Sequence, residues 1–571
     1  MRLDADRRDD RRRELATARD AMMAKLGFRD RLLAWRRSFS DPLRNEGAAA
    51  RWIEGLPAAD MLELQREALD VIASFPGGRR AIGPNQAEAL LRVDARCDPV
   101  IGHLTEQYAA NYQRSSAVET RLWHGAFDMV KAFIAAYQAT LKSGYNGEQR
   151  RWKAVLPKVV VRLGHHKGLD GKYRLFRYGH WIPAQWRELH ELYEFARMRG
   201  WQREPLAFGE EGFDKQGATL EHEYIKALLL MRLDSGSFTP DQIAWVSRSL
   251  DQWTGSLTLT PPPGGGANFY VDLTGTQGLK RLDKVKAGGR LLFLDTTPVY
   301  SRIVERLRWL PEQDEESRGS ADLPPREEKL LLMRLAALYG PESLAFSPRA
   351  PRRPAPVDSE VRVVVGLAAL TRAVAEVDRL SDDAKSKGAH HSFDEVTQMV
   401  SPTSNPDSVA RKVRGSQWKI ADLSETGCRL IAPAKDAPAR LGEMIAFRDP
   451  DGWSLAVVRR MQRQQVDEVI CGAEIIARRM VRVLLRTWAA PLDAGRAGID
   501  RPFFGIYLPA HQDNRQSAQR SLIGPDDRFL PGGMVELDTG NARYLIRFTQ
   551  TLERQAGWAW SLFNAVRKLS G

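Results

Sequence analysis

The chain has 571 residues, enough for about three or four domains with buried cores. Its 85 Lys and Arg outnumber its 72 Asp and Glu, and the net charge of +13 favours anionic partners such as nucleotides, nucleic acid or acidic lipid surfaces. Because the charges are dispersed, a solvated surface also accounts for them, and nucleic acid is not an expected partner.

Three features of the composition exclude whole classes of protein. The three cysteines (Cys97, Cys428 and Cys471) lie far apart, which argues against a disulfide framework and a zinc knuckle. No apolar run reaches transmembrane length, and Arg and Asp occupy the start of the chain where a signal peptide would be apolar. We therefore expect a cytoplasmic protein.

Helical periodicity dominates residues 1–253. Residues 1–45 are dense in Arg and Asp and predict a charged amphipathic helix or a frayed arm. Apolar residues then recur at helical spacing, without a fixed repeat period, so we expect an irregular helical bundle or helical-repeat-like domain that binds a partner or positions a neighbour. The later predicted helices cover 123–141, 150–165, 183–198, 219–233 and 239–253.

Residues 254–345 predict a small α/β region and a linker. A Pro- and Gly-rich loop at 261–266 precedes strand-like runs at 269–274 and 291–296. A helix around Ile303 follows, and a second helix is predicted from Pro325 to Tyr339, with Pro and two Glu at its start.

A basic, Pro-rich tract comes next and contains Arg349, Arg352 and Arg353. It leads into a predicted strand at 361–365, and a predicted helix at 367–380 follows the strand.

Residues 418–430 predict two strands joined by a tight corner. Trp418, Ile420 and Leu430 alternate with polar neighbours, and the corner reads D-x-S-x-x-G. Asp422 and Ser424 can accept or donate hydrogen bonds to nearby backbone groups, and Gly427 tolerates a positive φ where the chain reverses. Strand-sized runs follow at 441–447, 453–460 and 469–476, which indicates a small β-barrel.

The remaining chain predicts a further β unit. Residues 480–488 fit a short helix or strand, and strands are expected at 503–509, 534–537 and 544–548. We expect a terminal amphipathic helix carrying Trp558, Trp560, Leu562, Phe563 and Val566.

Residues 347–488 resemble the PilZ domain, a small β-barrel that binds cyclic di-GMP in many bacterial proteins. The resemblance rests on D-x-S-x-x-G at 422–427 and on the later strands, including L-A-V-V-R-R at 455–460 and C-G-A-E-I-I at 471–476. PilZ domains that bind the nucleotide carry R-x-x-x-R ahead of their first barrel strand, and Arg349 and Arg353 have that spacing. Their distance from Asp422 is longer than usual, which implies an insertion near 367–410 between the first and second barrel strands.

The resemblance implies a nucleotide site. Arginine can fork onto a phosphate and can pair with or stack on guanine. A carboxylate can accept from guanine N1–H and the exocyclic amine, and a hydroxyl can bond a phosphate or a base. The residues expected to bind cyclic di-GMP are Arg349, Arg352, Arg353, Asp422, Ser424 and Gly427.

Other interpretations stay open. The basic tract also fits a solubilising linker, Asp422 and Ser424 also fit a hairpin turn without a ligand, and some PilZ domains bind proteins and no nucleotide. A weaker alternative is a hydrolase that uses Asp272 or Asp295, which follow apolar runs. No paired carboxylates, phosphate loop or zinc spacing support it, and His165–His166 and His390–His391 are interpreted as solvated loop histidines.

The sequence thus predicts a multi-domain α+β protein: a helical domain (1–253), a small α/β region (254–345), a PilZ-like barrel (346–490) and a C-terminal β unit with a terminal helix (491–571). We expect a non-enzymatic signalling protein that binds cyclic di-GMP without cofactor or metal and relays binding to an unidentified protein partner through its helices. The rival is a nucleotide-free interaction scaffold. The oligomeric state is open, with a homo-oligomer among the alternatives.

Overall fold

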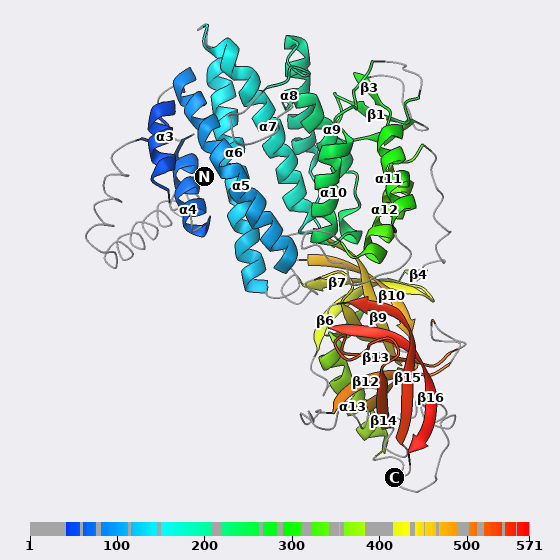
Figure 1. Ribbon diagram of the computed structural model, residues 1–571. Coiled ribbons are helices and arrows are strands. Elements are labelled where there is room, and N and C mark those ends of the chain that lie inside the picture. Colours follow the sequence, from blue (N-terminus) through cyan, green and yellow to red (C-terminus); the bar gives the residue numbers. More distant parts are fainter. Residues whose placement is uncertain are drawn as a thin grey trace, which may run out of the picture.

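The structure is a computed structural model, in which most of the helices form one half of the molecule and most of the β-strands form the other (Figure 1). The residues that the structure describes are 41–56, 61–75, 82–111, 116–145, 150–206, 218–261, 266–282, 289–310, 323–341, 353–354, 359–382, 415–433, 440–449, 452–463, 468–488, 502–510, 515, 519–538, 543–555 and 557–569.

The helical region is organised around one buried helix, α7 (Trp152–Leu175). It packs against its neighbours on all sides, so it lacks the polar face of a surface helix. The surrounding helices are α3 (Glu46–Glu54), α4 (Met61–Ser74), α5 (Pro84–Asn111), α6 (Ser116–Tyr145), α8 (Pro183–Arg199), α9 (Leu220–Leu230) and α10 (Pro240–Trp253).

The burial of α7 corrects one sequence prediction. His165 and His166 are not solvated loop residues, because both lie inside α7 and are buried. His166 Nε2 lies 2.9 Å from Asp94 Oδ1, and His165 Nδ1 lies 3.2 Å from Glu223 Oε2. The other predicted pair, His390–His391, lies outside the described residues.

The expected α/β region is present and packs onto the helices. Strands β1 (Phe269–Asp272), β2 (Lys280–Arg281) and β3 (Leu291–Leu294) form an antiparallel sheet in the order β2-β1-β3. Helices α11 (Thr297–Trp309) and α12 (Pro325–Tyr339) follow it. Their apolar side chains join the same hydrophobic core as the preceding helices.

The expected first barrel is a closed ring of six antiparallel strands, β5 to β10. Its order is β6-β5-β8-β9-β10-β7, closed by β6–β7 pairing, and β4 extends it beyond β6. Trp418 and Phe447 are among the side chains that fill its interior. The strands are β4 (Arg353–Pro354), β5 (Glu360–Val365), β6 (Ser416–Leu423), β7 (Gly427–Pro433), β8 (Met444–Asp449), β9 (Gly452–Arg463) and β10 (Glu468–Ala477).

The expected C-terminal β unit is a second closed barrel, ordered β11-β12-β13-β16-β15-β14. Residues 480–488, left open between helix and strand, supply β11. The strands are β11 (Val481–Thr487), β12 (Phe503–Leu508), β13 (Ser521–Gly524), β14 (Met534–Asp538), β15 (Arg543–Gln555) and β16 (Trp558–Leu569).

The predicted terminal helix is wrong, because β16 occupies its place and pairs with β13 and β15. Trp558 and Trp560 face the core between the two barrels, whereas Ala559 and Phe563 face the interior of the second barrel. Burial on both faces hides the period-two pattern of a strand, so the aromatic run looked like an amphipathic helix.

Helix α13 (Leu367–Asp382) joins the barrels. It lies between β5 and β6 in the sequence, as the predicted insertion required, and packs against β5, β8, β11 and β12. Leu370 and Val374 enter the core that the two barrels share. The rest of the expected insertion, 383–410, lies outside the described residues.

Candidate functional site at the β6–β7 corner

The D-x-S-x-x-G segment forms the predicted corner between β6 and β7. Asp422 and Leu423 end β6 and pair with Arg429 and Cys428 of β7. The turn is closed by Ser424, whose backbone N–H and hydroxyl both donate to the carbonyl oxygen of Gly427, at 2.7 and 2.9 Å.

Gly427 has a different role from the one expected. Its φ is not in the positive region, because it already lies in β7 opposite Glu474. A Cβ atom there would lie 3.1 Å from the carbonyl oxygen of Ala473, a tight contact. Glycine therefore allows close approach of β10 rather than a left-handed turn.

The basic tract reaches the corner through β4. Arg353 pairs with Leu423, and Pro354 pairs with Asp422, in antiparallel register. Arg349 and Arg352 lie outside the described residues. The second arginine of the R-x-x-x-R segment thus lies, by its backbone, directly beside the end of β6 that carries Asp422.

Asp422 is buried and forms an ion pair that the sequence interpretation missed. Arg429 Nε donates to Asp422 Oδ2 at 2.8 Å, while half of the Arg429 side chain stays exposed. Strand alternation in β7 could have placed Arg429 on the outer face, but the pairing with Asp422 depends on strand register across the hairpin. The carboxylate at the corner is therefore already held by a cation.

A row of outward-facing positions runs from Asp422 across three neighbouring strands. Arg429 lies opposite Gly472 of β10, and Gly472 lies opposite Arg460 of β9. Strands are about 4.8 Å apart, so Asp422 and Arg460 are separated by about 14 Å along this row. Gly472 has no side chain, which leaves space between the two arginines.

The far end of the row contacts the helical region. Arg460 Nη2 lies 3.1 Å from Asp234 Oδ1, next to the short helix η2 (Ser235–Ser237) that packs on β9. Arg463 N–H donates to the carbonyl oxygen of Tyr178, and the Tyr178 side chain enters the core of the first barrel. Nothing in the sequence indicated the Arg460–Asp234 ion pair or the Arg463–Tyr178 hydrogen bond, because the two residues of each pair are far apart in the chain.

A second group of charges lies beside Gly427 and leads to the second barrel. Glu474 accepts from Arg459 Nε at 2.9 Å and from Arg515 Nη1 at 3.0 Å. Arg459 also donates to Glu553 of β15, with Nη2 to Oε2 at 2.6 Å. The first barrel is thus tied by ion pairs to both of its neighbours.

The thiols near the corner are not nucleophiles at neutral pH. Cys428 and Cys471 point into the barrel, and burial raises the pKa of each to about 12.

The carboxylates proposed for the hydrolase alternative are not brought together. Asp272 lies opposite Leu291 at the start of β3, whereas Asp295 follows the other end of that strand. Asp272 accepts from the Thr274 N–H and hydroxyl, and Asp295 accepts from the Thr297 N–H, so each caps a local turn. The structure therefore gives no support to an acid–base pair at these positions.

The described residues hold no group of three or more His, Cys, Asp or Glu side chains arranged for a metal ion. Within the same residues, no helix combines the length and hydrophobicity that a bilayer crossing needs.

Comparison with known proteins bears on the helices rather than the barrels. No match was found among curated proteins or among solved structures. Residues 47–263, which begin within α3 and run past the end of α10, match the family described as the N-terminal domain of the cyclic di-GMP receptor FimW.

Proposed function

We propose that this protein binds cyclic di-GMP at the β6–β7 corner and transmits binding to its helical region. Two separate parts of the chain favour the same ligand: residues 47–263 match a cyclic di-GMP receptor family, and residues 347–488 resemble PilZ domains. The observation that carries the proposal is the pairing of Arg353 and Pro354 with Leu423 and Asp422. It brings Arg353, the last residue of the R-x-x-x-R segment, alongside the acidic corner.

The ligand would be bound by charge and by base edges. Arg349, Arg352 and Arg353 would fork onto the phosphates, and the Asp422 carboxylate would accept from guanine N1–H and the exocyclic amine. For this, guanine must displace Arg429 from Asp422. The released guanidinium then lies beside a phosphate or a base, so neither charge is left without a counterpart.

The space above Gly472 would hold the rest of the ligand. Arg429 and Arg460 lie on either side of this position, and a ligand with two bases and two phosphates could touch both Asp422 and Arg460. A planar guanidinium can stack on a base or bond a phosphate.

Arg460 would connect binding to the helices. If the ligand accepts a hydrogen bond from the Arg460 guanidinium, the ion pair of Arg460 with Asp234 weakens. The packing of η2 on β9 then changes. The helical region would then change its affinity for a protein partner. Such a relay requires a contact that differs between the ligand-free and the ligand-bound protein. The Arg460–Asp234 ion pair would be that contact.

Isothermal titration with cyclic di-GMP tests the binding. Loss of a charge-assisted hydrogen bond costs about 1.5–3 kcal/mol, so Arg349→Ala/Arg353→Ala should weaken binding at least about tenfold. Arg448→Ala is the matched control, because this arginine lies on β8, across the same barrel from β7. Absence of heat with the wild-type protein would instead favour a nucleotide-free scaffold.

A further inference from the structure

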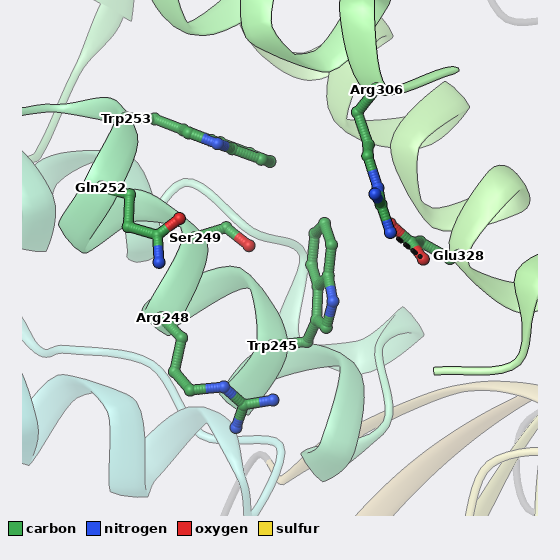
Figure 2. A pocket seen from close by; sticks show the side chains of 7 residues that line it. All are labelled: Trp245, Arg248, Ser249, Gln252, Trp253, Arg306 and Glu328. Carbon is green, nitrogen blue, oxygen red and sulfur yellow. Dashed lines mark hydrogen bonds and ion pairs between the residues drawn. The ribbon is translucent and has the colours of Figure 1, made fainter. Parts of the chain in front are cut away.

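A cleft in the helical region lies away from the β6–β7 corner. It has a volume of about 320 Å³ and opens between α10 on one side and Arg306 of α11 with Glu328 of α12 on the other (Figure 2). Ligand pockets in proteins usually have volumes of about 300–1,000 Å³, so this one suits a small ligand.

One face of α10 lines the cleft. Its residues recur at helical spacing, so they share a face. The opposite face of the helix holds Ile243, Val246 and Leu250, which are fully buried in the core. The core therefore fixes the orientation of the lining face, whose residues are Trp245, Arg248, Ser249, Gln252 and Trp253.

The two tryptophans form an aromatic corner. Their ring centroids lie 5.8 Å apart and their planes meet at 74°. Figure 2 shows both rings at the border of the cleft, with the Ser249 hydroxyl between them. A planar guest can therefore stack on one ring and present its edge to the other.

The charges of the cleft favour an anion. Arg306 donates to both carboxylate oxygens of Glu328, at 2.7 and 3.2 Å, and Glu328 is only 3% exposed. This bidentate pair holds the Arg306 guanidinium in place. Arg248 adds a second cation from α10, so the lining carries two positive charges against one negative charge.

We propose that this cleft binds a purine nucleoside monophosphate. The base would stack on Trp253 and the phosphate would contact Arg306 on the opposite side of the cleft. Arg248, Ser249 and Gln252 of α10 would supply hydrogen bonds to the base or ribose. The volume suits one base with one phosphate better than a cyclic dinucleotide. The cleft is therefore independent of the β6–β7 corner.

Titration of the full chain with guanosine and adenosine monophosphates, with and without saturating cyclic di-GMP, tests this site. Trp253→Leu removes the stacking surface and should weaken binding at least about fivefold. Arg248→Gln should weaken binding about tenfold. The controls are Trp309→Leu and Arg302→Gln, exposed residues of α11 that do not line the cleft, and both should bind as wild type.

Four results would overturn the proposal. These are no binding of either mononucleotide, abolition of binding by cyclic di-GMP, equal binding by inorganic phosphate alone, and equal losses in the lining and control variants. Circular dichroism confirms that each variant is folded, and Trp253→Phe, which keeps an aromatic face, should retain most of the affinity. The mononucleotide titration is informative even if cyclic di-GMP itself does not bind.

Discussion

Asp94 is the residue on which the charges inside the helical region converge. It accepts from Arg162 Nε and Nη2 at 2.6 and 2.7 Å and from the Tyr137 hydroxyl at 2.5 Å, and His166 lies against it as well. Burial disfavours a charged carboxylate, but Arg162 and His166 outweigh that effect and hold the pKa of Asp94 far below its usual range. Asp94 thus stays ionised inside the protein because Arg162 and His166 lie against it.

Replacement of Asp94 by Asn should destabilise the helical region by about 3–5 kcal/mol, because it leaves Arg162 as a buried charge without its main counterion. Urea unfolding followed by the helical circular dichroism signal measures this. The control is Glu46→Gln, which breaks the exposed Arg92–Glu46 pair and should cost less than about 1 kcal/mol. Equal effects of the two substitutions would contradict a structural role for the buried network.

The same region should lose stability in acid. Burial opposes ionisation of Glu223, but Lys226 and His165 outweigh it and hold its pKa well below the usual range; the pKa of Asp94 is lowered as well. A lowered folded-state pKa stabilises the fold above the unfolded value, near pH 4, and that stability is lost as pH falls through the folded value.

The free energy of unfolding of the helices should therefore decline below about pH 4, with a smaller slope in Glu223→Gln. Urea midpoints measured across the acid range test this. An identical slope in the variant would show that Glu223 is not linked to folding.

At the scale of the strands, β6, β7, β10 and β9 build the binding surface through their register. Arg429, Gly472 and Arg460 are brought into one row only by pairing between strands. A Cβ atom on Gly472 would lie 3.3 Å from the Arg460 Cβ, so a larger side chain must extend outward over the row.

Gly472→Leu should therefore block the proposed nucleotide site and weaken cyclic di-GMP binding at least about tenfold. Replacing a glycine in a strand interior is itself favourable, which offsets part of the cost of the tight contact with the Arg460 Cβ. Gln462→Leu is the control. It places the same side chain at an exposed position of β9, two residues along the strand from Arg460 and outside the row. Unchanged affinity in Gly472→Leu would exclude this row as the binding surface.

The β6–β7 corner could be predicted because its turn residues are neighbours in the sequence. Contacts between distant segments could not be predicted, because they depend on the folded structure. Asp422, Ser424 and Gly427 define a turn within six residues, and the flanking alternation defines two strands. The ion pair of Asp422 with Arg429 needs the register of the folded hairpin, and the pair of Arg460 with Asp234 needs the barrel to dock on the helices.

Burial on more than one side accounts for the wrong predictions. Helix α7 extends to Leu175, beyond the predicted end at residue 165. Because other helices surround it, the residues around His166 lack the amphipathic pattern that marks a surface helix. Strand β16 lies between two hydrophobic cores, so its outer face is as apolar at the start as its inner face. In both cases the neighbouring element, rather than the local sequence, determines the environment.

At the scale of the whole molecule, the first barrel is the connecting unit. It contacts the helical region through Arg460 and Tyr178, and it contacts the second barrel through Arg459 and the core around α13. The proposed nucleotide site lies on this barrel and extends from the β6–β7 corner to Arg460 of β9, which contacts the helices. Binding at this site could therefore change the contact between the first barrel and the helical region.

Hydrogen exchange of the full chain, with and without cyclic di-GMP, tests the location of binding most directly. The account predicts slower exchange of backbone amides at 422–427 in both the wild type and Arg460→Ala. A change at 233–240 should occur only in the wild type. Unaltered exchange at 422–427 under saturating nucleotide would contradict the proposed site.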